Sequence, residues 1–484
     1  MLFSSPVFLY LFLPLTLLLT ALAPKKIKNY ILLIASLIFY AWGGVYFMVL
    51  MLFSVFINYF FGIRVDSNKD NPKLRKNYLI IGVIINLLLL GVFKYTNFLV
   101  ASINDLLSLL NIAQLPQTDI KLPIGISFFT FQAMSYLIDV YRNDTNVQRK
   151  FSDLALYVSL FPQLIAGPIV RYHDVALQLE NRTVTAEKFK IGVQRFVMGL
   201  ARKVILANTF AGIATDIMSA PTESLDMIAI WFGLAAYTLQ IYYDFSGYSE
   251  MAIGLGKMFG FDFLENFNFP YLSKSFKEFW TRWHISLSTW IRDYIFFPLG
   301  GSKGSNIKTY RNLIIIFFIT GLWHGSSWNM VVWGFYHGFF MVIERLFLGK
   351  FLEKIPKIFG HIYFMLAFIL SWPLFLANSL NESAEYYKAM LGFNHIASNY
   401  INISTYLTVD NIILFILAIL GCTTFYINIF EKIKLYYFKQ SAKVKLLYSY
   451  TFEISSALFL VILLILSTVL LLTNTYNPFI YFRF

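Results

Sequence analysis

The stretch Leu313-Ile-Ile-Ile-Phe-Phe-Ile-Thr-Gly-Leu-Trp-His324-Gly-Ser-Ser-Trp328 carries a histidine at the end of an apolar run. A second apolar arm, Trp328–Ile343, follows it, and basic residues flank the pair at Arg311 and Arg345. Neither arm is long enough to cross a hydrocarbon core of about 30 Å comfortably. A helix rises about 20 Å between Arg311 and His324. The sequence therefore predicts a re-entrant hairpin from the inner face, with His324 at its tip near or beyond the bilayer middle.

An ionisable side chain at that depth requires a partner or a wet cavity, because burying it in lipid is costly. Irregular backbone there also requires surrounding protein or water. Gly321 and Gly325 leave room for another chain or a substrate beside His324. Imidazole titrates near neutral pH, which suits a general base. We interpret His324 as a catalytic base in a buried, partly wet cavity; the alternative is a structural histidine bonded within a helix bundle.

The composition is that of a membrane protein. Of the 484 residues, 58% are hydrophobic and only 13% are charged. Apolar windows of about 18 or more residues recur along the whole chain, as in transmembrane helices. We predict an all-α, polytopic transmembrane protein with about a dozen membrane segments, some of them re-entrant. Residues 1–484 are expected to form a single membrane-embedded domain.

The charges predict the orientation. Basic loops, which mark the cytoplasmic side, lie at residues 25–28, 64–76, 142–150, 188–203, 303–311, 345–357 and 432–445. Charge-poor or acidic loops lie at residues 102–118, 219–226 and 378–410. This alternation places the protein in the cytoplasmic (inner) membrane with both termini outside. The net charge of +13 suits loops facing an anionic lipid surface, and no nucleic acid is expected as a partner.

A second histidine, His284, lies in the aromatic and basic stretch Phe279–Asp293. Apolar and charged residues mix there at helical spacing, which predicts an interfacial or cavity-lining helix. The alternative is a snorkelling interfacial helix with the histidine at its polar edge. We expect His284 to lie in the same cavity as His324, on its cytoplasmic side.

Further polar groups interrupt apolar runs. Asp244 either orients a histidine or substrate hydroxyl, or anchors two helices by a hydrogen bond. The segment Leu160–Arg171 carries two prolines and a glycine, which predicts a broken helix that lines a cavity. Arg171 is expected either to pair with a phosphate or to anchor the segment at the cytoplasmic side. His337 follows His324 on the second arm, about 20 Å away if the helix is continuous.

Motifs for metal or nucleotide chemistry are missing from the sequence. It holds no HExxH, no CxxC and no carboxylate-rich cluster, so no metal is expected. It has no phosphate-binding glycine loop, which argues against a primary ATP-driven pump. The GxSxG match at residues 300–304 stands in a polar loop and is interpreted as chance.

Several blocks together resemble the membrane-bound O-acyltransferase (MBOAT) family, most of all its bacterial alginate O-acetylation and peptidoglycan O-acetyltransferase-like branch. The blocks are residues 1–5, 123–127, 161–171, 243–248, 279–301 and 321–338. The resemblance implies the MBOAT fold with a central cavity and a catalytic role for His324. His284 matches a second site position, where many relatives carry asparagine.

The resemblance also implies a donor and partners. The donor would be acetyl-coenzyme A or an acyl carrier protein thioester, used from the cytoplasm. The acceptor would be an extracytoplasmic polysaccharide or peptidoglycan, reached directly or through an SGNH-type acetyltransferase partner. Basic side chains on the cytoplasmic side would suit the donor's phosphates. The outer segment 378–410 is the expected docking site for such a partner, and membrane lipid surrounds the protein.

Two other classes of protein remain open from the sequence. A transporter or flippase for a cell-envelope precursor would also have broken helices and buried ionisable groups, but no inverted repeat is evident. A structural subunit that anchors a secreted enzyme would leave both intramembrane histidines unexplained. A passage from the cytoplasmic face past His324 would favour the O-acyltransferase.

Overall fold

The computed structural model describes the chain except for residues 166, 395–399, 439–441, 474–476 and 479–484. Helices dominate it, as predicted, and the one β-bridge within the described residues joins Phe267 to Trp283. Six helices in this part of the chain are long and apolar enough to cross a membrane, and the bent pair α20–α21 makes a seventh if it is one span. The predicted dozen segments include shorter helices, and that count stays a prediction.

The α-helices of the described residues run in this order: α1 Leu13–Leu22, α2 Lys25–Ala41, α3 Val45–Ser67, α4 Pro72–Leu109, α5 Ile126–Arg142, α6 Phe151–Ser159, α7 Phe161–Leu164, α8 Tyr172–Glu180, α9 Ala186–Ala201, α10 Asn208–Met218, α11 Met227–Met258, α12 Phe276–Arg282, α13 Ile285–Ile291, α14 Asn306–His324, α15 Trp328–Ile343, α16 Gly349–Leu352, α17 Lys357–Ile369, α18 Trp372–Leu376, α19 Leu380–Met390, α20 Val409–Gly421, α21 Phe425–Phe438 and α22 Ala442–Thr473. A π-helical turn, η2 (Arg202–Ala207), joins α9 to α10. The predicted break in Leu160–Arg171 is confirmed by the short helix α7.

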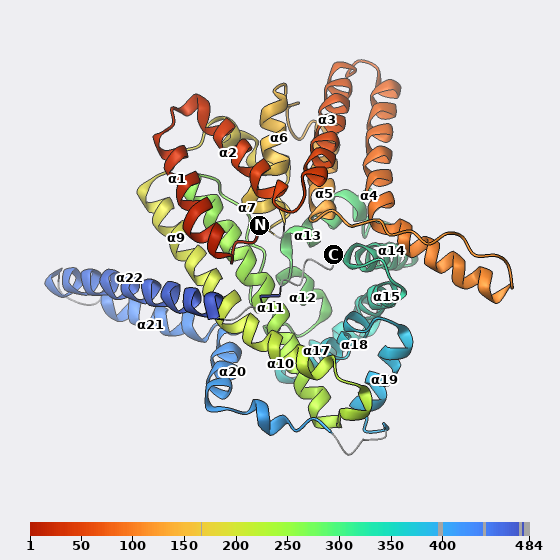
Figure 1. Cartoon of the computed structure of the whole chain (residues 1–484), viewed down its shortest axis with the longest axis vertical. Coiled ribbons are helices and arrows are strands. Elements are labelled where there is room, and N and C mark those ends of the chain that lie inside the picture. Colours follow the sequence, from red (N-terminus) through yellow and green to blue (C-terminus); the bar gives the residue numbers. More distant parts are fainter. Residues whose placement is uncertain (166, 395–399, 439–441, 474–476, 479–484) are drawn as a thin grey trace.

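The long helix α11 forms the centre of the molecule (Figure 1). It packs most extensively against α9, and two glycines on each helix explain why. A Cβ atom on Gly199 would lie 2.6 Å from the carbonyl oxygen of Gly247, and one on Gly254 would lie 2.6 Å from that of Gly192. Small residues let membrane helices approach backbone to backbone. These glycines therefore fix α9 against α11.

The predicted hairpin forms as α14–α15, and its re-entrant course stays a prediction. The expectation that neither arm can cross a membrane is wrong for the second arm, because its helix continues beyond Ile343 and Trp328–Leu352 is long and apolar enough to do so. Helix α14 ends at His324, and the Ser327 hydroxyl accepts a hydrogen bond from the Met330 amide at the start of α15. Gly321 and Gly334 face each other: a Cβ atom on either would meet a backbone carbonyl oxygen of the opposite helix. The close crossing holds the tip of the hairpin, and therefore His324, in one place.

The periphery differs from the centre in exposure. Figure 1 shows α21 and α22 lying side by side and reaching outward from the body. Only 6% of the apolar window in Tyr448–Thr473 is buried in the protein. An apolar helix with so little protein contact is expected to face lipid.

Helix α19 and the residues that follow it carry three large aromatic side chains, Tyr386, Tyr387 and Phe393. Phe393 is exposed, but Tyr386 is buried and donates to the Met218 carbonyl at 2.6 Å. Tyr387 donates to the Leu370 carbonyl at 2.8 Å. The hydroxyls of both tyrosines therefore tie α19 to neighbouring helix ends.

Candidate active site

His324 is buried among aromatic rings at the end of α14. Its ring centroid lies 4.9 Å from that of Trp323, 5.0 Å from Trp333 and 5.8 Å from Phe375. Only 5% of the residue is exposed. A dry aromatic setting of this kind strengthens every electrostatic interaction made by the imidazole.

Two residues of α4 hold the C-terminal end of α14. Lys94 donates to the carbonyl of Trp323, and the Tyr95 hydroxyl donates to the carbonyl of Leu322 at 3.0 Å. Helix C-terminal carbonyls lack partners within the helix and attract a cation. These two contacts therefore fix the backbone immediately before His324.

Lys94 also brings a positive charge to the site. It is 5% exposed, and its ammonium donates to Ser127 Oγ at 3.1 Å and to the carbonyl of Trp323, the residue before His324. No carboxylate among the described residues forms an ion pair with it. The sequence analysis missed Lys94, although a lysine that follows the apolar run 78–93 is a signal for a functional intramembrane charge.

The surroundings of His284 predicted a position within a helix, but the residue lies outside one. It stands between α12 and α13 in the left-handed conformation, with φ of 45°. The β-bridge from Phe267 to Trp283 precedes it, and the chain enters α13 directly afterwards. His284 is fully buried, so an exposed snorkelling position is excluded.

Asn266 fixes the His284 ring. Its Oδ1 lies 3.2 Å from His284 Nδ1 and accepts from the Ser286 hydroxyl at 2.9 Å. Its Nδ2 donates to Ser249 Oγ at 3.0 Å. Because an amide oxygen only accepts, we assign the proton to His284 Nδ1, which leaves the lone pair on Nε2. That atom has no hydrogen-bond partner within the described structure and is free to receive a hydroxyl proton.

The fold brings three histidines together. The Trp323 ring lies 5.7 Å from His284 and 4.9 Å from His324. On the other side of the site, Trp333 lies 5.0 Å from His324 and 4.3 Å from His337. The separation of about 20 Å applied only to a continuous helix. The chain instead reverses between α14 and α15, as the hairpin predicted, and one indole ring lies between the imidazoles of His324 and His337.

A cavity of about 950 Å³ opens between α12, α13, α14 and the α15–α17 segment. Its inner wall includes Phe317 and Thr320 of α14 and Ser288 of α13. Thr320 precedes His324 by one helical turn, or about 6 Å of rise. Neither His284 nor His324 lines the cavity, and the Trp280 ring, 6.3 Å from Trp333, stands in the wall.

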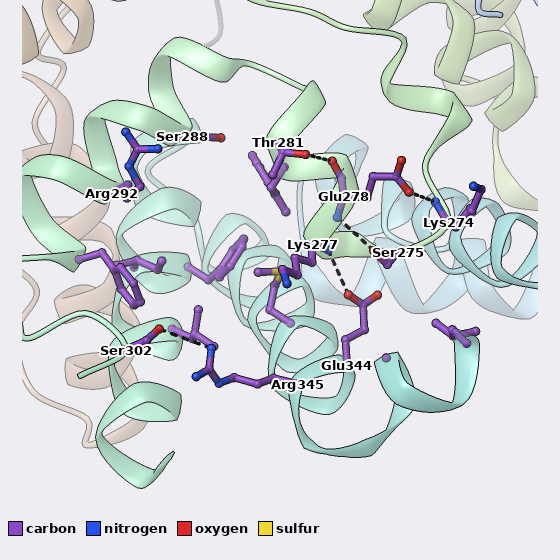
Figure 2. A pocket seen from close by; sticks show the side chains of 18 of the residues that line it. Lys274, Ser275, Lys277, Glu278, Thr281, Ser288, Arg292, Ser302, Glu344 and Arg345 are labelled. Carbon is purple, nitrogen blue, oxygen red and sulfur yellow. Dashed lines mark hydrogen bonds between the residues drawn. The ribbon is translucent and has the colours of Figure 1, made fainter. Parts of the chain in front are cut away.

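The mouth of the cavity is basic. Figure 2 shows Arg292 and Arg345 on one side of it and Lys274 and Glu344 on the other. Six basic residues line it: Lys274, Lys277, Arg292, Arg345, Lys350 and Lys357. Of these, only Arg292 has an ion-pair partner among the described residues, namely Asp293. Two of the acidic side chains are already bonded: Glu278 pairs with Arg282, and Glu344 accepts from the Phe276 and Lys277 amides. The mouth therefore carries unpaired positive charge.

Two other candidates lie in internal ion pairs. Asp244 pairs with buried Lys203 of η2 at 2.8 Å, which favours its reading as an anchor between helices. Arg171 pairs with Asp174 at 3.0 Å and Asp293 at 2.9 Å, which favours an anchor over a phosphate ligand. No group of three or more His, Cys, Asp or Glu side chains in the described part of the chain is placed to hold a metal ion.

Several bacterial proteins are similar to this chain over most of its length. The protein named "Probable alginate O-acetylase AlgI" of Pseudomonas aeruginosa is 43% identical over 433 residues, covering 88% of this chain and 82% of that protein. The protein of the same name in Pseudomonas putida is 41% identical over 491 residues, covering all of this chain and all of that protein. The peptidoglycan O-acetyltransferase of Helicobacter pylori is 34% identical over 432 residues, covering 82% of this chain and 81% of that protein.

The family comparison covers the histidine site directly. Residues 95–384, which contain His284, His324 and the whole cavity, match the membrane-bound O-acyltransferase family. The agreement extends to relatives aligned over most of their length. The chain therefore belongs to the membrane-bound O-acyltransferase (MBOAT) family.

Proposed function

We propose that this O-acyltransferase moves an acetyl group from a cytoplasmic thioester to a hydroxyl of an extracytoplasmic polysaccharide or peptidoglycan. One observation carries the proposal: a basic cavity ends one helical turn short of His324. The similar proteins named for alginate and peptidoglycan O-acetylation support the acetyl group and the class of acceptor.

The donor is acetyl-coenzyme A or an acyl carrier protein thioester. Both carry phosphate next to a flexible pantetheine arm, and the unpaired Lys and Arg side chains at the cavity mouth supply the matching charge. The predicted inside loops 303–311 and 345–357 border this mouth, which supports donor entry from the cytoplasm. Apolar residues deeper in the cavity, such as Ile285 and Ile316, suit the arm and acetyl group.

His324 acts as the general base and then the general acid. The acceptor hydroxyl oxygen attacks the thioester carbonyl carbon while His324 takes the hydroxyl proton. The carbon–sulfur bond then breaks, and His324 returns the proton to the leaving thiolate. The Lys94 ammonium provides positive charge for the oxyanion that forms between these steps. His284, through its Nε2 lone pair, accepts a hydrogen bond from a neighbouring hydroxyl of the acceptor and so orients it.

The acetyl group leaves on the outer face, directly or through an SGNH-type partner, as the family resemblance implies. The outer segment 378–410 remains the proposed docking surface, represented by exposed residues such as Phe393. Deleting the whole segment would remove the buried anchor Tyr386, so a docking variant must change exposed positions only.

One membrane domain in the cytoplasmic membrane, with both termini outside, completes the proposal. Asn477 donates to the hydroxyl of Ser4 at 3.1 Å, which places these two residues at the same end of the molecule. Helix α22 packs on α9 of the central group, which supports a single unit.

The proposal is tested in sealed vesicles that contain the purified protein and trapped acceptor oligosaccharide. Acetyl-labelled thioester added outside should release free thiol outside and transfer label to the trapped acceptor, with the SGNH partner included where needed. Intact thioester should stay outside. Transport of an intact precursor without thiol release would instead establish the transporter or flippase.

His284→Asn is expected to keep measurable activity, about tenfold below the wild type, because an amide retains hydrogen bonding but no proton-accepting nitrogen. Asparagine also tolerates the left-handed conformation at this position better than most residues. The measurement is thiol release at saturating donor and acceptor. Full loss of turnover at normal abundance would show that the imidazole itself transfers a proton.

A further inference from the structure

His337 is a buried imidazole for which the proposed mechanism has no use. It is 0% exposed, and six aromatic rings surround it: Phe276, Trp280, Phe317, Trp333, Tyr336 and Phe368. Neither ring nitrogen has a hydrogen-bond partner in the described structure. Buried polar groups are nearly always paired, so two unpaired nitrogens on one ring indicate a missing ligand.

The same cluster contains two more unpaired donors. The indole nitrogens of Trp280 and Trp333 are buried, and the described residues offer them no acceptor. Both rings contact His337, with centroids 5.6 Å and 4.3 Å away. The cluster therefore holds two indole N–H groups and an imidazole that provides one donor and one acceptor.

The position of the cluster identifies what reaches it. Trp280 and Phe317 line the donor cavity, and Trp333 contacts His324. The unpaired groups thus lie between the cavity and the catalytic histidine. A pantetheine arm that passes the Trp280 side of the cavity wall would cross this region on its way to His324. Its amides offer carbonyl acceptors and N–H donors, the complement of this set.

We propose that His337, Trp280 and Trp333 form a subsite that binds an amide group of the donor's pantetheine arm when the Trp280 side of the wall opens. This subsite rests on the proposed function, because it presupposes a thioester donor in the cavity. It serves coenzyme A and carrier-protein donors alike, since both present the same arm.

The test compares acetyl-coenzyme A and acetyl-pantetheine with S-acetyl-2-mercaptoethanol, a thioester without amides. The variant is His337→Phe, which keeps an aromatic ring and removes both nitrogens. The ratio of kcat/KM for an amide-bearing donor to kcat/KM for the short donor should fall about tenfold, the effect of one lost hydrogen bond in a buried site. Trp333→Phe should lower the same ratio. Abundance and thermal stability of His337→Phe should equal or exceed those of the wild type, because no bonded polar group is removed.

Trp372→Phe is the matched control. Its indole nitrogen already donates to Thr238 Oγ1 at 2.9 Å, so the change should cost stability and leave the donor ratio unaltered. An unaltered ratio in His337→Phe, or an equal loss for long and short donors, overturns the subsite. If the wild-type protein releases thiol from none of these donors, the thioester donor of the proposed function fails first, and the subsite fails with it. In the active wild-type protein, acetyl-coenzyme A and an acetylated carrier protein are assayed side by side. The better donor shows whether coenzyme A or a carrier protein supplies the pantetheine arm.

Discussion

His324→Ala is expected to reduce acetyl transfer on the order of 10³-fold, the contribution of a well-placed general acid–base group. The loss should appear in kcat, because the charged mouth of the cavity, which binds the donor, is unchanged. The protein should still accumulate in the membrane, since the α14–α15 crossing rests on Gly321 and Gly334 rather than on the imidazole. The measurements are thiol release by purified protein, acetate content of the envelope glycan and membrane abundance.

Two further variants define the role of His324. His324→Gln keeps a polar side chain without a base and should be as inactive as the alanine variant. His361→Ala removes a half-buried histidine whose Nδ1 lies 3.1 Å from the Ser273 carbonyl, and it should retain acetylation. Normal turnover of His324→Ala at normal abundance would remove this residue from the chemistry.

Lys94→Met is the second change with a large expected effect. It removes the ammonium that caps α14 at Trp323 and places charge near the oxyanion, so kcat should fall on the order of 10²-fold. Methionine fills a similar volume, and a buried lysine without a paired carboxylate is costly, so thermal stability in detergent should change little. Turnover and thermal unfolding are measured on the same preparation.

Tyr95→Phe provides the comparison for Lys94. It removes the neighbouring bond to Leu322 but no charge. If only the hydrogen bonds to the end of α14 matter, Lys94→Met and Tyr95→Phe should lose similar amounts of activity. If the charge matters, Lys94→Met loses far more, and Lys94→Arg restores part of the rate. Equal and small losses of activity in Lys94→Met, Lys94→Arg and Tyr95→Phe would show that Lys94 has only a structural role.

The hairpin and its histidine were predictable because their signals are local. An apolar run, two glycines and basic flanks in Arg311–Arg345 specify a helix pair with His324 at the end of its first helix, while its side of entry stays a prediction. The helical class and the broken segment Leu160–Arg171 follow equally from local composition. Family resemblance pointed to His284 as a second site position, which stays a prediction; the structure places it beside the Trp323 ring that also contacts His324, and its predicted helical context was wrong.

The remainder of the site depends on distant residues. Asn266 reaches His284 through a bridge and a left-handed residue, neither of which has a periodic signature. Lys94 resembles an ordinary interfacial anchor until α4 packs against the end of α14. Tyr386 resembles a headgroup residue until its hydroxyl finds the Met218 carbonyl. Tertiary packing determines these hydrogen-bond partners, and no local pattern in the sequence indicates them.

The aromatic wall between the donor cavity and His324 also has a consequence for the energy supply of the cell. A water-filled passage lined with imidazoles would conduct protons and dissipate the proton gradient that drives ATP synthesis. Trp280 packs edge-on against Phe317 and Trp333 in this wall, with ring centroids 5.5 Å and 6.3 Å away, and such apolar rings oppose a continuous chain of water. In the proposed cycle the wall parts only for a ligand that fills the gap it opens. In that proposed cycle, the acetyl group would pass the wall while the membrane keeps its voltage.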